Sequence, residues 1–207
     1  GLGRNLKEQG EYAKAIELFS HVIKIHPEYS SGYSFRAEAY IKQKRLNEAA
    51  DDILTALDID EDRKAYYLLI SEYTDEKSLN LLKGKFQIKK TKEPNNVYWS
   101  YYYGLVLENN RLYKEAIEQY QSCKRINAST LFDEQIAYCY SKMGDFERAL
   151  EYVNYAIAVD STDADYYEQR ANIYGEMGNR AKAIENLTKY IEFYPEYSYA
   201  YYRRGWY

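Results

Sequence analysis

The side chains that most often bind metals or act as nucleophiles are scarce in this sequence. His21 and His26 are its two histidines, and Cys123 and Cys139 are its two cysteines. The histidines have no third ligand nearby, a pattern that favours exposed side chains over a metal site. Each cysteine stands in a helical apolar pattern, so buried free thiols are favoured over a disulfide. The sequence therefore predicts no metal, no cofactor and no cysteine–histidine catalysis.

Other signatures of enzyme chemistry are missing from the sequence too. It has no glycine-rich phosphate loop and no Cys-x2-Cys pair. The tripeptides that begin at Asn127 and Asn186 fit the N-glycosylation pattern, for which chance is the favoured explanation. We expect a protein that is not an enzyme.

The charge of the chain narrows the class of partner. A formal net charge of −4 argues against nucleic acid as the main partner. The exception is the segment 83–92, which carries five lysines and no acid. Such a segment could contact an acidic partner, but a solvated outer face of a helix is the favoured interpretation.

The composition is that of a soluble protein with unusually many tyrosines. There are 27 tyrosines against 6 phenylalanines, so much of the apolar bulk carries a hydroxyl that needs water or a partner. No stretch approaches the roughly 18 apolar residues of a membrane-spanning helix, so direct membrane insertion is not expected. The chain opens with Gly-Leu-Gly instead of Met, which is compatible with a removed leader. The compartment is therefore not determined, with the cytoplasm slightly favoured.

The sequence contains an internal repeat. Alanines followed by Ile or Leu, or preceded by Asn-Glu, stand at positions 15, 49, 116, 149 and 183, with spacings of 34, 67, 33 and 34. The gap of 67 is one spacing of 33 plus one of 34, so it contains one further, divergent copy. Glycines at 10, 144 and 178 precede the alanines at a constant distance, and prolines at 27, 94 and 195 fall between copies.

A unit of 34 residues with Gly-x-aromatic in its middle and Ala-x3-bulky in its second half resembles the tetratricopeptide repeat, a helix–turn–helix unit. The resemblance implies an all-α fold, a right-handed α-solenoid of tandem units with a concave face lined by the first helix of each unit. The whole chain, 1–207, is expected to be one array. Its register gives a partial copy at 1–29, full copies at 30–63, 97–129, 130–163 and 164–197, a divergent copy at 64–96, and the start of another at 198–207.

Elementary physics supports this pattern independently. Alanine at a closest helix contact lets two helices approach, and Gly10, Gly144 and Gly178 stand where a first helix must end. Thr130 and Thr162 offer hydroxyls to cap the following helices. In the aromatic run 97–107, bulky residues recur every four positions, at Trp99, Tyr103 and Leu107, and this spacing predicts a helix. We expect these three side chains to pack against neighbouring helices of the array, and Gly104 to lie where a neighbouring helix approaches closely.

The resemblance also implies which residues face the concave groove, because family members use fixed positions of the first helix. From 97–129 these include Tyr98, Tyr101, Tyr102 and Leu105. The candidate groove residues from the following copies are Glu134, Tyr138, Glu168, Asn172, Tyr199, Tyr202 and Trp206. The groove would be aromatic at both ends and acidic between them. An extended or helical peptide with basic and apolar residues would fit it, although rings at these positions could equally cover neighbouring helices.

One known subset of the family holds peptide C-terminal carboxylates in a clamp of Lys, Asn and Arg. The corresponding positions here hold Ser34, Phe35 and Glu38, and Glu168 replaces the lysine that should accompany Asn172. A clamp for acidic tails is therefore not expected.

The sequence thus predicts a protein–protein interaction module, a scaffold or adaptor that binds a peptide or protein in the groove. The alternative is a structural or regulatory repeat arm of a larger protein whose catalytic or membrane-anchored domain lies outside this chain. The uncovered rings of the last helix, which include Tyr202 and Trp206, also allow end-to-end self-association of the array.

Overall fold

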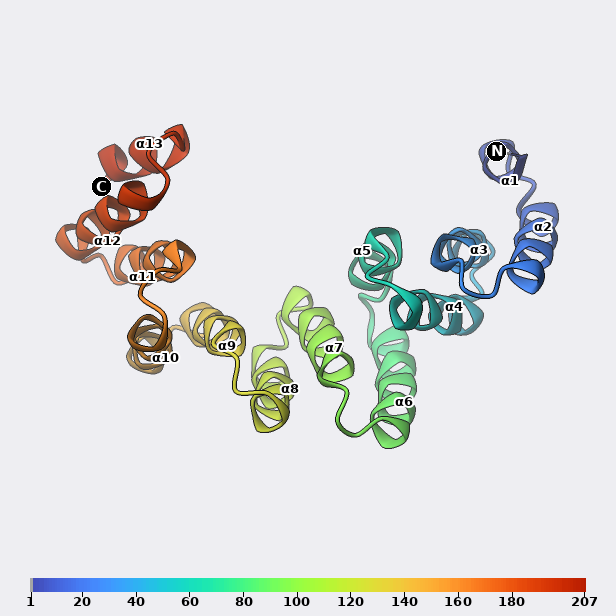
Figure 1. Cartoon of the computed structure of the whole chain (residues 1–207), viewed down its shortest axis with the longest axis horizontal. Helices are drawn as coiled ribbons and strands as arrows, with labels where there is room; N and C mark the ends of the chain where they lie inside the picture. Colours follow the sequence, from blue (N-terminus) through green and yellow to red (C-terminus); the bar gives the residue numbers. More distant parts are fainter. Residues whose placement is uncertain (1) are drawn as a thin grey trace. The chain divides into compact units, whose positions relative to one another are not determined.

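The computed structural model describes residues 2–207, apart from the side chain of Arg4. Within these residues there are thirteen α-helices and no strand (Figure 1). The chain divides into two compact units, Gly1–Glu93 and Pro94–Tyr207. We call these unit 1 and unit 2.

Unit 1 consists of helices joined by short turns, and most of them pack against the preceding or following helix of the chain; the last helix, 76–92, packs instead against the helix 46–59. The predicted copy 30–63 holds two of them, α3 and α4, which pack closely as an antiparallel pair. The helices are α1 (Leu2–Glu8), α2 (Tyr12–Ile25), α3 (Ser30–Lys42), α4 (Leu46–Ile59), α5 (Arg63–Glu72) and α6 (Glu76–Lys92).

Unit 2 repeats the same arrangement, with three helix pairs and one final helix. The helices are α7 (Val97–Asn109), α8 (Tyr113–Ile126), α9 (Leu131–Lys142), α10 (Phe146–Val159), α11 (Ala164–Glu176), α12 (Arg180–Phe193) and α13 (Ser198–Trp206). The helices α7, α9, α11 and α13 are the first helices of their copies. As predicted, Pro27, Pro94 and Pro195 lie in the turns between copies.

The recurring alanines are buried inside the helix pairs. All five, at 15, 49, 116, 149 and 183, are fully buried at 0% exposure, as the pattern predicted. A larger side chain at such a site would overpack the helix pair at a cost of about 1–3 kcal/mol. The repeat of about 34 residues is therefore also a repeat of buried small residues.

The turns inside the pairs require a left-handed residue. Gly10, Gly144 and Gly178 adopt φ of 78°, 77° and 75°, which confirms their predicted role. Lys44 and Arg111 take the same place in their copies with φ of 60°. This conformation costs a residue with a side chain about 1–2 kcal/mol, so these two turns are strained where the other three are not.

Helix capping differs from the prediction at both threonines. Helix α11 is capped by Asp163, whose carboxylate accepts a hydrogen bond from the Asp165 amide at 3.0 Å. Thr162 instead donates to Asp160 at 2.6 Å. Thr130 precedes α9 but makes no cap bond, because its hydroxyl accepts one from Tyr166 at 2.8 Å. A stronger acceptor or a competing donor displaces the threonine in each case.

The aromatic run 97–107 is helical, as predicted, and its step of four is buried. Trp99, Tyr103 and Leu107 are 1%, 9% and 3% exposed. A Cβ added at Gly104 would lie 2.6 Å from the Tyr120 ring, so glycine is required for this close approach.

The lysine-rich segment 83–92 lies on α6 and does not form the purely solvated face that was expected. Lys85 and Lys89 form ion pairs with Asp51 and Asp58 of α4, at 2.7 and 2.5 Å. These pairs tie α6 to α4, so part of this segment's charge is balanced inside unit 1.

Candidate functional site

The first helices of unit 2 contact one another directly. The Gln169 side-chain amide on α11 donates to the Glu134 carbonyl on α9 at 2.6 Å. Glu176 on α11 accepts hydrogen bonds from both Ser141 and Lys142 of α9, at 2.5 and 2.6 Å. These bonds set α9 beside α11, so side chains from the two helices share one face. We call the outward surface of α7, α9, α11 and α13 the first-helix face.

The α7 part of this face is less open than the sequence suggested. Tyr98 is 52% exposed, whereas Tyr102 is 8% exposed. The Tyr102 ring lies 6.2 Å from that of Tyr98, 6.4 Å from Trp99 and 6.0 Å from Tyr101. Most of Tyr102 is therefore closed to a partner by its neighbours on the same helix.

Two further predicted residues of α7 are half-buried. Tyr101 has its ring 6.1 Å from Phe132 of α9 and 6.3 Å from Tyr120 of α8. Leu105 is of intermediate exposure. Tyr101 thus joins neighbouring helices, and Tyr98 is the ring that α7 offers to solvent.

Tyr138 on α9 is exposed and carries its own cation. The Lys142 ammonium lies 5.3 Å from the centre of the Tyr138 ring. Burial, and next the charge of Glu108 on α7, raise the pKa of the Tyr138 hydroxyl. The thiol of Cys139, the residue after Tyr138, donates a hydrogen bond to Glu108 at 3.8 Å, so Glu108 of α7 lies against α9.

Glu134 is the centre of the acidic part of the face. Burial raises its pKa to about 7, followed in size by the charges of Asp165, Asp163, Glu108 and Glu168. All four of these neighbouring charges are carboxylates. They come from α7, from α11 and from the turn before α11. The half-buried Glu134 therefore experiences a negative environment and is partly protonated near neutral pH.

The other two predicted polar residues are engaged inside the chain. The Arg203 guanidinium of α13 donates to Glu168 at 2.6 Å and also to the Asn172 side-chain oxygen. This contact holds α13 against α11. Glu168 and Asn172 of α11 therefore already have a partner within unit 2, which the sequence did not reveal.

Helix α13 presents the most exposed rings of unit 2. Tyr199, Tyr202 and Trp206 are 53%, 67% and 74% exposed. The rings of Tyr199 and Tyr202 stack at 6.1 Å, one turn apart on the helix.

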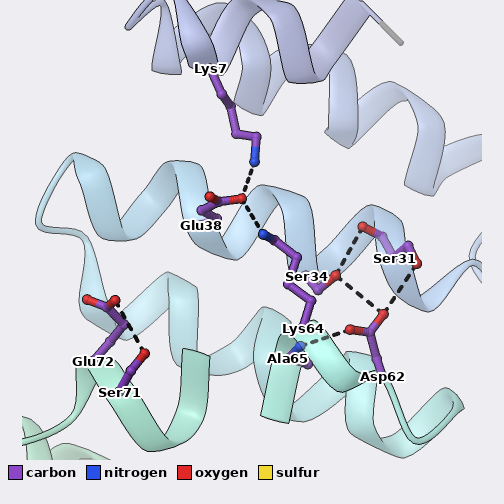
Figure 2. A network of polar contacts seen from close by, with 9 residues as sticks. All are labelled: Lys7, Ser31, Ser34, Glu38, Asp62, Lys64, Ala65, Ser71 and Glu72. Atoms are coloured by element: carbon purple, nitrogen blue, oxygen red, sulfur yellow. Dashed lines mark hydrogen bonds and ion pairs between the residues drawn. The ribbon is translucent and has the colours of Figure 1, made fainter. Parts of the chain in front are cut away.

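In unit 1 the corresponding first helices α1, α3 and α5 meet at Glu38 (Figure 2). Its carboxylate pairs with Lys7 of α1 and with Lys64 of α5, the latter at 2.7 Å. Although burial opposes it, hydrogen bonds from Lys64 and Lys7 lower the pKa of Glu38. Both lysines also lie about 5 Å from the Phe35 ring, at 5.0 and 5.2 Å.

The turn before α5 makes a second set of polar contacts with α3. The Asp62 carboxylate caps the helix through the Ala65 amide at 2.8 Å and accepts from Ser31 and Ser34 of α3 at 3.3 Å (Figure 2). These bonds position α3 beside α5.

Neither unit assembles a metal or thiol site within residues 2–207. No group of three His, Cys, Asp or Glu side chains there could hold a metal ion. His21 is exposed, and the two cysteines are buried and free, as predicted. No helix in this part of the chain is long and apolar enough to cross a membrane.

Two family models, each described as a tetratricopeptide repeat, match the sequence. One covers residues 6–73, and the other covers residues 134–163 and 164–197. The chain belongs to the tetratricopeptide repeat family.

One curated relative of this tetratricopeptide repeat chain is the Hsp70-Hsp90 organizing protein of Triticum aestivum. The two are 22% identical over 215 residues, which is 94% of this chain and 34% of the relative. The chain therefore spans about a third of that protein's length.

Solved tetratricopeptide repeat structures share the fold. TTC0263 of Thermus thermophilus matches with a TM-score of 0.55 at 17% identity, over 99% of this chain and 94% of its own. YrrB, described as a TPR protein with an unusual peptide-binding site, matches with a TM-score of 0.50 at 20% identity, over 98% of this chain and 88% of its own. The fold class predicted from the sequence, an all-α solenoid of tandem helix–turn–helix units, is confirmed.

Proposed function

We propose that this tetratricopeptide repeat chain is a non-catalytic protein-interaction module that binds a basic, partly apolar segment of another protein on the first-helix face of unit 2. One observation carries the proposal: exposed rings of α7, α9 and α13 flank a set of carboxylates centred on Glu134. Tyrosine and tryptophan give large contact areas with few rotatable bonds, which suits them to binding hot spots.

Charge supports a basic partner. The largest charges acting on Glu134 are all negative, and a lysine or arginine from a partner would relieve their repulsion. The nearby cations Lys142 and Arg203 are already paired, with Glu176 and Glu168. A positive charge from a partner would therefore balance the carboxylates around Glu134.

Relatives give coarser support. The family and the wheat relative agree with a role as an interaction scaffold. The second candidate, a structural or regulatory repeat arm of a larger protein, is separated from the first by whether the isolated chain binds a segment by itself.

The proposal is tested by selecting peptides from a random display library on the full chain and measuring the Kd of a selected peptide. We expect selected peptides to be enriched in Lys or Arg beside apolar residues, and to compete with one another for unit 2. Enrichment of acidic peptides, or binding that is unchanged when Tyr98, Tyr138 and Tyr202 are replaced by alanine, would refute it.

A further inference from the structure

A pocket lined by aromatic rings lies in unit 2 where α12 ends and α13 begins. It has a volume of about 560 Å³. Its rings are Tyr190, Phe193, Tyr194 and Tyr197, and its carboxylates are Asp165 and Glu196. We call it the Tyr190 pocket. Among the described residues, no lysine, arginine or histidine lines it.

The rings of the Tyr190 pocket pack edge-to-face or stacked against neighbouring rings, and these contacts hold them in place. Tyr190, which is 7% exposed, meets Tyr194 edge-on at 5.2 Å and Tyr197 edge-on at 5.9 Å. Phe193 is held by stacking on Tyr167 of α11 at 6.0 Å. One ring is thus fixed in the core, and the others are supported around it with much of their surface open.

These rings differ from many tyrosines of the chain in lacking an internal cation. Elsewhere, arginine or lysine lies over the rings of Tyr40, Tyr140 and Tyr174, at 4.4, 4.4 and 4.9 Å. Within residues 2–207, no such contact is made to the four rings of the pocket. Asp165 and Glu196 likewise have no ion-pair partner among these residues. The pocket therefore combines electron-rich faces and negative charge without the positive group that accompanies them elsewhere.

The turn between α12 and α13 can be compared with the equivalent turn of the first copy. Residues 25–29 read Ile-His-Pro-Glu-Tyr, and residues 193–197 read Phe-Tyr-Pro-Glu-Tyr, at the same place in the repeat. In the first copy Glu28 lies 3.4 Å from His26. In the last copy Tyr194 replaces that histidine, so Glu196 loses the neighbour that could carry a positive charge, and the loop gains a ring.

We propose that the Tyr190 pocket binds an organic cation, and that in the assembled state this cation is a lysine or arginine side chain of the protein partner. Aromatic faces attract such groups through the ring quadrupole, and nearby carboxylates add charge attraction. Asp165 belongs to α11, so the pocket adjoins the first-helix face. Only the source of the cation rests on the proposed function; the preference of the pocket for cations does not.

The first experiment needs no partner. Choline and its neutral isostere 3,3-dimethylbutanol are titrated into the full chain, and the tyrosine ring resonances are followed by NMR. We expect choline to bind roughly fivefold or more tightly, since one cation–π contact contributes about 1 kcal/mol. Equal binding of the two compounds, or no saturable binding of choline, would overturn the proposal.

Variants assign the effect to the pocket. Tyr194→Leu and Asp165→Asn should each weaken choline binding severalfold, and because both side chains are exposed, their circular dichroism should be unchanged. Tyr67→Leu, at an exposed tyrosine of unit 1, is the matched control and should bind choline like the native chain. An equal loss in the control would overturn the assignment.

A second arm identifies the source of the cation. The peptides Gly-Gly-Lys-Gly-Gly and Gly-Gly-Arg-Gly-Gly, acetylated and amidated at their ends to remove the terminal charges, are compared with a peptide capped in the same way in which norleucine replaces the basic residue. Tighter binding of either basic peptide, lost in Tyr194→Leu, supports a partner side chain. If choline binds but neither basic peptide exceeds the norleucine peptide, the pocket takes a small organic cation and the link to a protein partner is refuted.

Discussion

Replacing Glu134 with glutamine should make the protein more stable while weakening its proposed binding. Burial, reinforced by neighbouring carboxylates, raises the pKa of Glu134 from 4.5 to about 7. A raised carboxylate pKa means that the folded state binds the proton more tightly than the unfolded state. The stabilising effect of the bound proton is complete below pH 4.5 and is lost as pH rises through about 7.

The magnitude follows from the size of the pKa shift. At about 1.36 kcal/mol per pKa unit the full shift corresponds to roughly 3 kcal/mol. Because the side chain is only half-buried, solvent screening reduces the expected effect to about 1–2 kcal/mol. Glu134→Gln removes the charge that is unfavourable at high pH, so it should raise the free energy of unfolding by this amount at pH 8 and by almost nothing at pH 4.

The assay is urea unfolding of the native chain and the variant at both pH values. Glu147→Gln, at an exposed position of α10, is the control and should show no pH-dependent difference. The same variants are then tested with a basic peptide selected on the native chain, for which Glu134→Gln should raise the Kd. Equal stability differences at pH 4 and pH 8, or a destabilised variant at pH 8, would refute the reasoning.

Three further predictions concern the fold. The Arg36 guanidinium binds Asp52, which is 5% exposed, at 2.7 Å, and Arg36→Met leaves this carboxylate buried without a partner. The variant should therefore lower the free energy of unfolding by about 3 kcal/mol in urea. The double variant with Asp52→Asn should recover part of this loss. Lys44→Gly should raise thermal stability, because relief of about 1–2 kcal/mol of strain exceeds the roughly 0.5–1 kcal/mol entropic cost of glycine; a lower Tm would contradict this. Gly104→Ala should destabilise by about 1–2 kcal/mol in urea, since its Cβ would lie 2.6 Å from the Tyr120 ring and this clash outweighs the better helix propensity of alanine; a more stable variant would show that the ring can move.

The repeated helix pairs could be predicted because their closest contacts restrict residue type. Only a small side chain fits at Ala116 or Ala149, and glycine enters the left-handed turn at Gly144 without strain. The same reasoning overlooked Lys44 and Arg111, since these turns accept strain and so carry no glycine to identify them.

The sequence predicted which helix positions carry the candidate site residues, but not how exposed these residues are or which neighbours they contact. Position on a helix placed Tyr102 on the face, but contacts between rings on one helix leave it 8% exposed. It also placed Glu168 and Asn172 there, but their bonds to Arg203 depend on how α13 packs on α11.

The Tyr190 pocket depends on the angles of rings that come from two helices and a turn. The only sequence signal for it was the Phe-Tyr-Pro-Glu-Tyr run at 193–197.

The proposed binding role is tested most directly by a matched pair of triple variants. Tyr98, Tyr138 and Tyr202, exposed on the first-helix face, are replaced by alanine in one; Tyr29, Tyr67 and Tyr155, exposed elsewhere, are replaced in the other. The Kd of a library-selected peptide should rise about tenfold or more in the first, which corresponds to about 1.4 kcal/mol, and stay unchanged in the second, with similar Tm values for both. Equal losses in the two variants, or no loss in the first, would contradict the proposal that the first-helix face of unit 2 binds the partner.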